Sequence, residues 1–164
     1  MKEVVLWNVN LDEITEVYES LDLEKKYVDN PIHSRGRLEF VAGVRVNGNI
    51  AGVGGLNKRL GIFPFSFYIV KPEFRRRGIS RELTRMIVDY TKQRRGNYFL
   101  SSFRIENTIS MAMEIKYGYR IVYKSANYYK SCYPVNTRGN VICRILPLLY
   151  KIYFFLNRVR GKRW

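Results

Sequence analysis

The residues best suited to chemistry lie between Phe67 and Leu83, a stretch that contains Arg75, Arg76, Arg77 and Gly78. Aromatic and β-branched residues at its start favour a strand, and apolar residues at helical spacing follow the glycine. Three guanidinium groups and a glycine therefore stand where a helix is predicted to begin. Unpaired amides, the helix dipole and arginine side chains together favour a bound phosphate. In so basic a chain, a solvated cationic face is the alternative.

The spacing Arg75-x-x-Gly78-x-Ser80 resembles the pyrophosphate loop of the GNAT superfamily of acyl-CoA-dependent N-acetyltransferases. That family has Gly or Ala at the last position. Ser80 departs from this pattern, but its amide could serve equally and its hydroxyl could cap the helix. Two motifs in the expected order are more specific than one, and the resemblance covers residues 4–130. The second motif is Asn107-x-x-Ser110 followed by Lys116-x-Gly118-Tyr119.

The resemblance implies a single-domain α/β fold, with a central, mixed but mostly antiparallel sheet flanked by helices. Residues 1–130 would form the GNAT-like domain, and 131–164 would add a C-terminal extension with an apolar, basic helix. In the GNAT fold the strand before the loop and the next strand splay apart, and the pantetheine of CoA enters this wedge. Acetyl-CoA or another acyl-CoA, without a metal, is thus the implied co-substrate. The residues implied to bind it are Tyr68, Ile69, Val70, Arg75, Arg76, Arg77, Gly78, Ile79, Ser80 and Asn107.

Hydrophobic periodicity predicts the remaining elements. Asn10 is expected to cap a helix through a capping box with Glu13, and Asn47-Gly48 to turn a hairpin. The resemblance implies that two loops, 30–36 and 58–64, line the acceptor pocket. The other expected strands are 4–7, 40–46, 50–56, 65–70, 97–103 and 119–129, and the other expected helices are 23–28, 79–95 and 108–117.

The reaction implied by the resemblance is direct transfer of an acyl group from a thioester to an amine within a ternary complex. A base must take a proton, because most amines are protonated at neutral pH, and a strand amide near Tyr68 or Ile69 would stabilise the oxyanion. The strand before the loop lacks the family's usual glutamate. The family's acid tyrosine, seven residues after the motif asparagine, is replaced by Glu114. The candidates for proton transfer are Glu114, Tyr117 and Glu106, followed by Tyr128 and His33.

Glu114 also has a structural interpretation, as a surface carboxylate paired with Lys116 or Lys124. The lone histidine, His33, lies in a predicted loop, where an inert role is common. The sequence therefore specifies the cofactor site better than it specifies the base and the acid.

The net charge of +15 is unevenly distributed. Residues 1–66 hold 8 Lys/Arg and 9 Asp/Glu, whereas residues 67–164 hold 21 and 5. This excess indicates an anionic partner, which could be an anionic amine substrate such as a sugar precursor, or a membrane surface. Nucleic acid is the less favoured third option.

The two cysteines, Cys132 and Cys143, have no metal-ligand spacing and no signal peptide precedes them. We therefore expect reduced thiols in a cytoplasmic protein, with peripheral contact to a membrane as an option.

Residues 141–156 are strongly apolar, and a basic segment ending in Trp164 follows. The run predicts a helix with Pro147 in its first turn. It is too short to span a bilayer, and it contains Arg144 and Lys151. Two interpretations stay open: the helix packs on the domain or on a second copy in a homodimer, or it lies in a membrane interface.

Two other function classes compete with the enzyme. One is a non-enzymatic basic module that binds nucleic acid or an anionic membrane, and the other is a GNAT-fold protein that binds CoA without turnover. Gly78 lies at the family's sequence spacing from Pro72 and Asn107. This spacing favours a CoA site, since a generic basic patch needs no glycine there. The acceptor amine, the acyl chain and the oligomeric state are not specified by these motifs.

Overall fold

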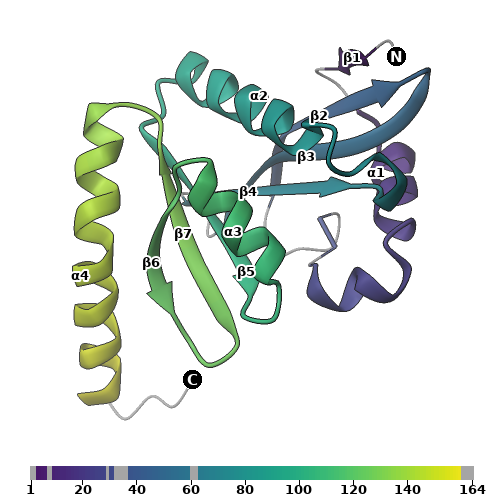
Figure 1. Ribbon diagram of the computed structural model, residues 1–164. Coiled ribbons are helices and arrows are strands. Elements are labelled where there is room, and N and C mark those ends of the chain that lie inside the picture. Colours follow the sequence, from purple (N-terminus) through teal and green to yellow (C-terminus); the bar gives the residue numbers. More distant parts are fainter. Residues whose placement is uncertain (1–2, 7–8, 29, 32–36, 60–62, 160–164) are drawn as a thin grey trace.

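The computed structural model describes residues 3–6, 9–28, 30–31, 37–59 and 63–159. In this part of the chain a seven-stranded sheet has the order β1-β2-β3-β4-β5-β7-β6 (Figure 1). All neighbouring strands are antiparallel except β4 and β5. The predicted α/β fold with a mixed, mostly antiparallel sheet is thereby confirmed. The strands are β1 (Glu3–Leu6), β2 (Arg37–Val46), β3 (Asn49–Arg59), β4 (Phe63–Val70), β5 (Tyr98–Arg104), β6 (Arg120–Lys124) and β7 (Tyr128–Pro134).

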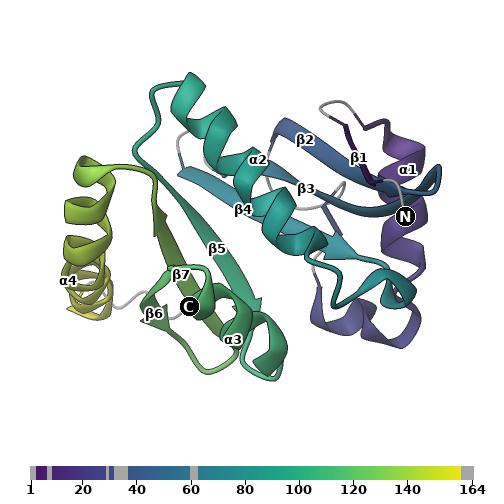
Figure 2. The same cartoon turned by 45° about the horizontal axis from the view of Figure 1, so that its top comes forward.

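Helices cover both faces of the sheet (Figures 1 and 2). On β7, successive side chains point to opposite faces: Ser131 donates to Glu114 of α3, whereas Cys132 contacts Cys143 of α4. At the other end of the sheet, α1 and α2 pack in separate apolar clusters around Ile14 and Met86. The helices are α1 (Leu11–Glu19), α2 (Ile79–Gln93), α3 (Thr108–Lys116) and α4 (Thr137–Val159), with short 3₁₀ turns η1 (Asp22–Tyr27) and η2 (Pro72–Phe74).

Local sequence signals account for several boundaries. The predicted capping box is present, because Asn10 accepts from the Glu13 amide and the Glu13 carboxylate accepts from the Asn10 amide. Asn47 and Gly48 both have positive φ, as a two-residue hairpin turn requires.

The glycines of β3 let α2 approach the sheet closely. A Cβ on Gly54 would lie 3.2 Å from Cβ of Leu83, and one on Gly52 would lie 3.0 Å from Cγ2 of Ile79. The first turn of α2 is therefore held directly over β3. This contact fixes the loop between β4 and α2 relative to the strands.

Three boundary predictions are wrong. Residues 58–64 are not one loop, since β3 runs to Arg59 and β4 begins at Phe63. The strand expected over 119–129 is a hairpin of β6 and β7, because the Ser125 hydroxyl accepts the amides of Asn127 and Tyr128 and turns the chain. Pro147 lies inside α4, since that helix begins at residue 137.

Other predictions fall outside the described residues. They concern His33 and most of the 30–36 loop. In the described part of the chain, no helix is long and apolar enough to cross a membrane.

The expectation of two reduced thiols is wrong, because Cys132 of β7 and Cys143 of α4 form a disulfide. Their Cα atoms are 5.6 Å apart, within the range that a disulfide requires. Sequence spacing could not show this, since the pairing depends on α4 folding back across the face of β7. The bond joins the C-terminal helix covalently to the sheet.

Candidate active site

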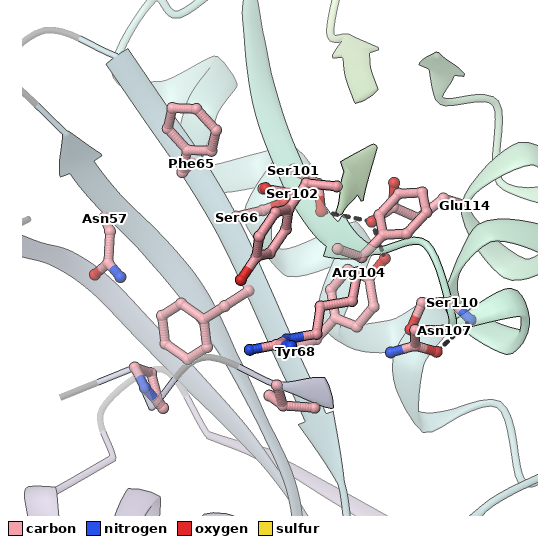
Figure 3. A pocket seen from close by; sticks show the side chains of 15 residues that line it. Asn57, Phe65, Ser66, Tyr68, Ser101, Ser102, Arg104, Asn107, Ser110 and Glu114 are labelled. Atoms are coloured by element: carbon pink, nitrogen blue, oxygen red, sulfur yellow. Dashed lines mark hydrogen bonds between the residues drawn. The ribbon is translucent and has the colours of Figure 1, made fainter. Parts of the chain in front are cut away.

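A cleft opens where β4 and β5 diverge. Among the described residues, these parallel strands share one paired position, Phe65 with Leu100. Beyond it Tyr68 and Ser102 lie on opposite walls of the cleft, with Asn107, the residue before α3, at one end (Figure 3). The edge of β4 after Phe65 thus faces a pocket and not a neighbouring strand. This is a splayed pair of the kind that the sequence resemblance implies.

The loop after β4 leads into α2 through a left-handed glycine. Gly78 has φ +81° and is the N-cap of α2, where it provides no side-chain cap. A Cβ at this position would meet nothing within 4 Å, so there is open space next to the residue at which α2 begins. Open amides at the positive end of a fifteen-residue helix fit a phosphate group.

The arginines of this loop differ in their surroundings. Arg75 forms two hydrogen bonds with the carboxylate of Glu24 in η1, at 2.9 and 2.6 Å. Arg76 is exposed, and Arg77 stacks over the ring of Phe74. The side chain of Arg75 is consequently held by the Glu24 carboxylate, which would compete with a bound phosphate for it.

The suggestion that Ser80 caps α2 is wrong, because Gly78 occupies the cap position. The Ser80 hydroxyl lies 3.2 Å from the phenolic oxygen of Tyr117, at the end of α3. This contact links the first turn of α2 to the helix that carries the second motif.

Glu114 is buried at the inner end of the wedge, with 1% relative exposure. Its Oε1 accepts from Tyr68 at 2.8 Å and from Ser101 at 2.5 Å (Figure 3). Its Oε2 accepts from Ser131. Three hydroxyl donors from three strands therefore surround one carboxylate. The alternative of a surface Glu114 paired with a lysine is wrong.

Burial dominates the protonation of this cluster. Desolvation raises the pKa of Glu114, and the three hydroxyl donors only partly oppose this shift. Burial also raises the pKa of Tyr68, and the nearby Tyr119 and Glu114 add to that effect. The pair consists of a phenol that keeps its proton and a carboxylate that gains one more readily than usual.

The other proton-transfer candidates occupy different places. Tyr128 lines the pocket, and the Arg104 guanidinium lies 5.6 Å from its ring centroid. Glu106 is exposed and does not line the pocket. Tyr117 contacts Ser80 away from the pocket lining. Of the three leading candidates, the structure brings only Glu114 into the wedge.

The remaining residues predicted to bind the cofactor differ in their surroundings. Asn107 caps α3 by accepting the Ser110 amide at 3.0 Å, and both residues line the pocket. Ile69 is buried against α1 in the neighbouring apolar cluster, while Val70 leads into the loop. Ile79 is buried at the start of α2.

Sequence reasoning missed Ser101 and Ser131, the hydroxyl donors to Glu114. Both are buried and lie at paired positions of β5 and β7. A buried polar side chain in an otherwise apolar strand needs a hydrogen-bond partner. That signal was available in the sequence, but the partner on α3 was not.

Comparison with known protein families shows the family to which the chain belongs. The sequence model of the Acetyltransferase (GNAT) family matches residues 6–119. The chain therefore belongs to the GNAT acetyltransferase family, and acyl transfer from an acyl-CoA is its general chemistry. No curated protein matches the sequence significantly.

Three solved structures that share this fold are distant in sequence. Ard1 from Thermoplasma volcanium is 18% identical with a TM-score of 0.66, over 83% of this chain and 99% of its own. The ribosomal-protein-S18-alanine N-acetyltransferase from Escherichia coli is 14% identical with a TM-score of 0.60, over 83% and 96%. The yncA protein from Salmonella typhimurium, solved with its cofactor acetyl-CoA, is 10% identical with a TM-score of 0.60, over 82% and 95%. At these identities the likeness shows the fold alone.

Proposed function

We propose that this protein is an N-acyltransferase that moves an acetyl group from acetyl-CoA directly to an amine. The observation that carries the proposal is the Tyr68–Glu114 hydrogen bond at the inner end of the wedge. It places a buried carboxylate and a phenol where β4 and β5 separate. A carboxylate with a raised pKa suits proton transfer near neutral pH.

The cofactor site follows the path from the wedge to the loop. The diphosphate of acetyl-CoA would bind at the first amides of α2, beside Gly78, with Arg75, Arg76 and Arg77 as cationic partners. Pantetheine would lie along the edge of β4 that β5 leaves unpaired, at Tyr68 to Val70. A backbone amide at Tyr68 or Ile69 would then stabilise the oxyanion.

Tyr68 and Glu114 would handle the proton as a pair. The amine would react in its neutral form, after its ammonium proton has left to solvent. When its nitrogen bonds to the thioester carbon, the phenolic oxygen of Tyr68 accepts a proton from nitrogen and passes its own to Oε1 of Glu114. The C–S bond then breaks, and the proton returns through Tyr68 to the leaving sulfur. The products are an amide and the free thiol of CoA, and the pair is restored.

The test is steady-state release of the CoA thiol across a panel of amines, which covers protein N-termini, lysine, sugar amines and polyamines. With the amine that works, Glu114→Gln and Tyr68→Phe should each lower kcat by about 100-fold or more. KM for acetyl-CoA should stay nearly unchanged, since neither hydroxyl nor carboxylate contacts the phosphate loop.

Tyr98→Phe is the matched control, because Tyr98 is another partly buried tyrosine with a raised pKa but lies in a different cluster. It should retain wild-type kcat. A Glu114→Gln enzyme with full kcat, or a large loss in Glu106→Gln instead, would refute the proposed proton path. Acetyl-CoA binding with no turnover on any amine would favour a protein that binds CoA without catalysis.

A further inference from the structure

The outer side of α4 carries an apolar strip that no described part of the chain covers. Its five members, here called the α4 stripe, each have a relative exposure between 45% and 58%. Scattered exposed apolar residues are ordinary, but a contiguous set on one helix face marks an interaction surface. They recur at intervals of three and four residues, and so share one face of the helix. The α4 stripe consists of Val141, Ile145, Leu148, Leu149 and Ile152.

The inner side of α4 is fixed, so the stripe cannot turn inward. Cys143 is bonded to Cys132 of β7, and Leu146 is buried in the same cluster. Tyr150 and Phe154 stack on the ring of Tyr123 in β6. The apolar strip is therefore a constant feature of the folded protein.

Cations accompany the stripe. Arg144 and Lys151 are exposed and stand seven residues apart, which places them along one edge of it. From residue 115 to residue 164 the chain has 11 Lys/Arg and no Asp or Glu. An apolar strip beside two exposed cations, with no acid from residue 115 onward, is the pattern of a helix that lies on an anionic bilayer.

We infer that α4 docks the protein on a membrane surface rich in anionic lipid. The α4 stripe would insert among the acyl chains of the lipids, and the lipid phosphates would pair with Arg144 and Lys151. A second copy fits less well, because it would bring together two cationic faces that carry no acidic residue to pair with them.

Docking through α4 leaves the wedge accessible. α4 lies on the face of β7 toward which Cys132 points, whereas α3 and Glu114 lie on the opposite face. In Figures 1 and 2, α4 runs along the outside of the molecule beside β6 and β7. The surface thus serves as an anchor that is separate from the cofactor site.

The experiment is sedimentation of the full-length, disulfide-bonded protein with vesicles. One set is pure phosphatidylcholine, and the other contains about one third phosphatidylglycerol as the anionic lipid. We expect binding to the anionic vesicles only. Leu148→Ser combined with Ile152→Ser should weaken it by about tenfold or more, and Arg144→Glu combined with Lys151→Glu by a similar factor.

Matched controls make the same kinds of substitution away from the α4 stripe, to separate the effect of position from that of overall composition. Leu11→Ser with Leu23→Ser removes two leucines elsewhere that are at least as exposed as Ile152, and Lys92→Glu with Arg94→Glu makes the same change of charge at the C-terminal end of α2. Both should leave vesicle binding within about twofold, apart from a small effect of net charge. Because all the substituted side chains are exposed, the variants should fold, which circular dichroism would verify.

Three results would overturn the inference. The first is equal vesicle binding by the wild type and by Leu148→Ser with Ile152→Ser, and the second is absence of binding to anionic vesicles. The third is a dimer in sedimentation velocity that the same two substitutions dissociate. RNA or DNA binding that survives Leu148→Ser with Ile152→Ser, in a protein that ignores vesicles, would assign the charge to nucleic acid instead.

Discussion

The phenolic oxygen of Tyr68 lies 2.8 Å from Oε1 of Glu114, although the two residues are 46 positions apart. Tyr68 belongs to β4 and Glu114 to α3, so the bond ties α3 to one of the two strands that form the wedge. Since the Glu114 carboxylate is buried in the folded protein, its protonation is coupled to folding.

The pH dependence of activity should show a displaced acidic limb. Glu114 can accept a proton only as a carboxylate, and burial raises its pKa above the ordinary range. As pH falls through that raised pKa, kcat/KM should decline, at a pH higher than an ordinary glutamate would produce. The measurement is kcat/KM against pH for the wild type and Glu114→Gln. An acidic limb at the same pH in Glu114→Gln and in the wild type would show that another group titrates there.

The same pKa predicts the direction of a stability change. Because the folded-state pKa of Glu114 is raised, the native protein keeps a proton that the unfolded chain releases. Its contribution to the free energy of unfolding is thus largest below the ordinary pKa of glutamate and is lost as pH rises through the folded pKa. Urea unfolding at several pH values should show the stability of the wild type falling relative to that of Glu114→Gln over this window. A difference that stays constant with pH would contradict it.

Removing the carboxylate that holds Arg75 should strengthen cofactor binding. Glu24 bonds the Arg75 guanidinium through both oxygens, so it competes with phosphate for that cation. Glu24→Gln should lower the Kd for acetyl-CoA by about 2- to 10-fold. Glu19→Gln is the matched control, since Glu19 pairs with Lys25 nearby and is also exposed. Weaker binding in Glu24→Gln would mean that Glu24 positions Arg75 for the phosphate instead.

Reduction of the disulfide should destabilise the protein. The bond between Cys132 and Cys143 closes a short loop of sequence separation 11, which is worth roughly 2–3 kcal/mol in the unfolded chain. Cys143→Ser should lower the free energy of unfolding by about that amount, while reductant should have no effect on the variant. Two titratable thiols in the native oxidised protein would rule the bond out.

Local signals predicted much of the fold because each is complete within a few residues. The capping box at Asn10 and the turn at Asn47-Gly48 both formed as expected. The β6–β7 turn and the start of α4 were missed, since Ser125 and Pro147 each allow more than one local structure. Tertiary contacts decide between them.

The site was predictable where it depends on backbone geometry. Gly78 was singled out from spacing, and it does adopt a left-handed conformation at the start of α2. The environment of Glu114 was not predictable, because Ser101, Ser131 and Tyr68 come from three strands. The same holds for the Cys132–Cys143 bond, which depends on how α4 packs.

The most direct test of the central claim is calorimetric titration of acetyl-CoA into the wild type, Gly78→Glu and Gly48→Glu. Gly48 and Gly78 have nearly equal positive φ and equally open surroundings, so the two substitutions impose similar backbone strain. Only Gly78→Glu places a carboxylate beside the first amides of α2. The proposal predicts one-site binding that is tighter than that of ADP, is kept in Gly48→Glu and is lost in Gly78→Glu. Binding that ADP equals, or that both variants retain alike, would contradict an acyl-CoA site at this loop.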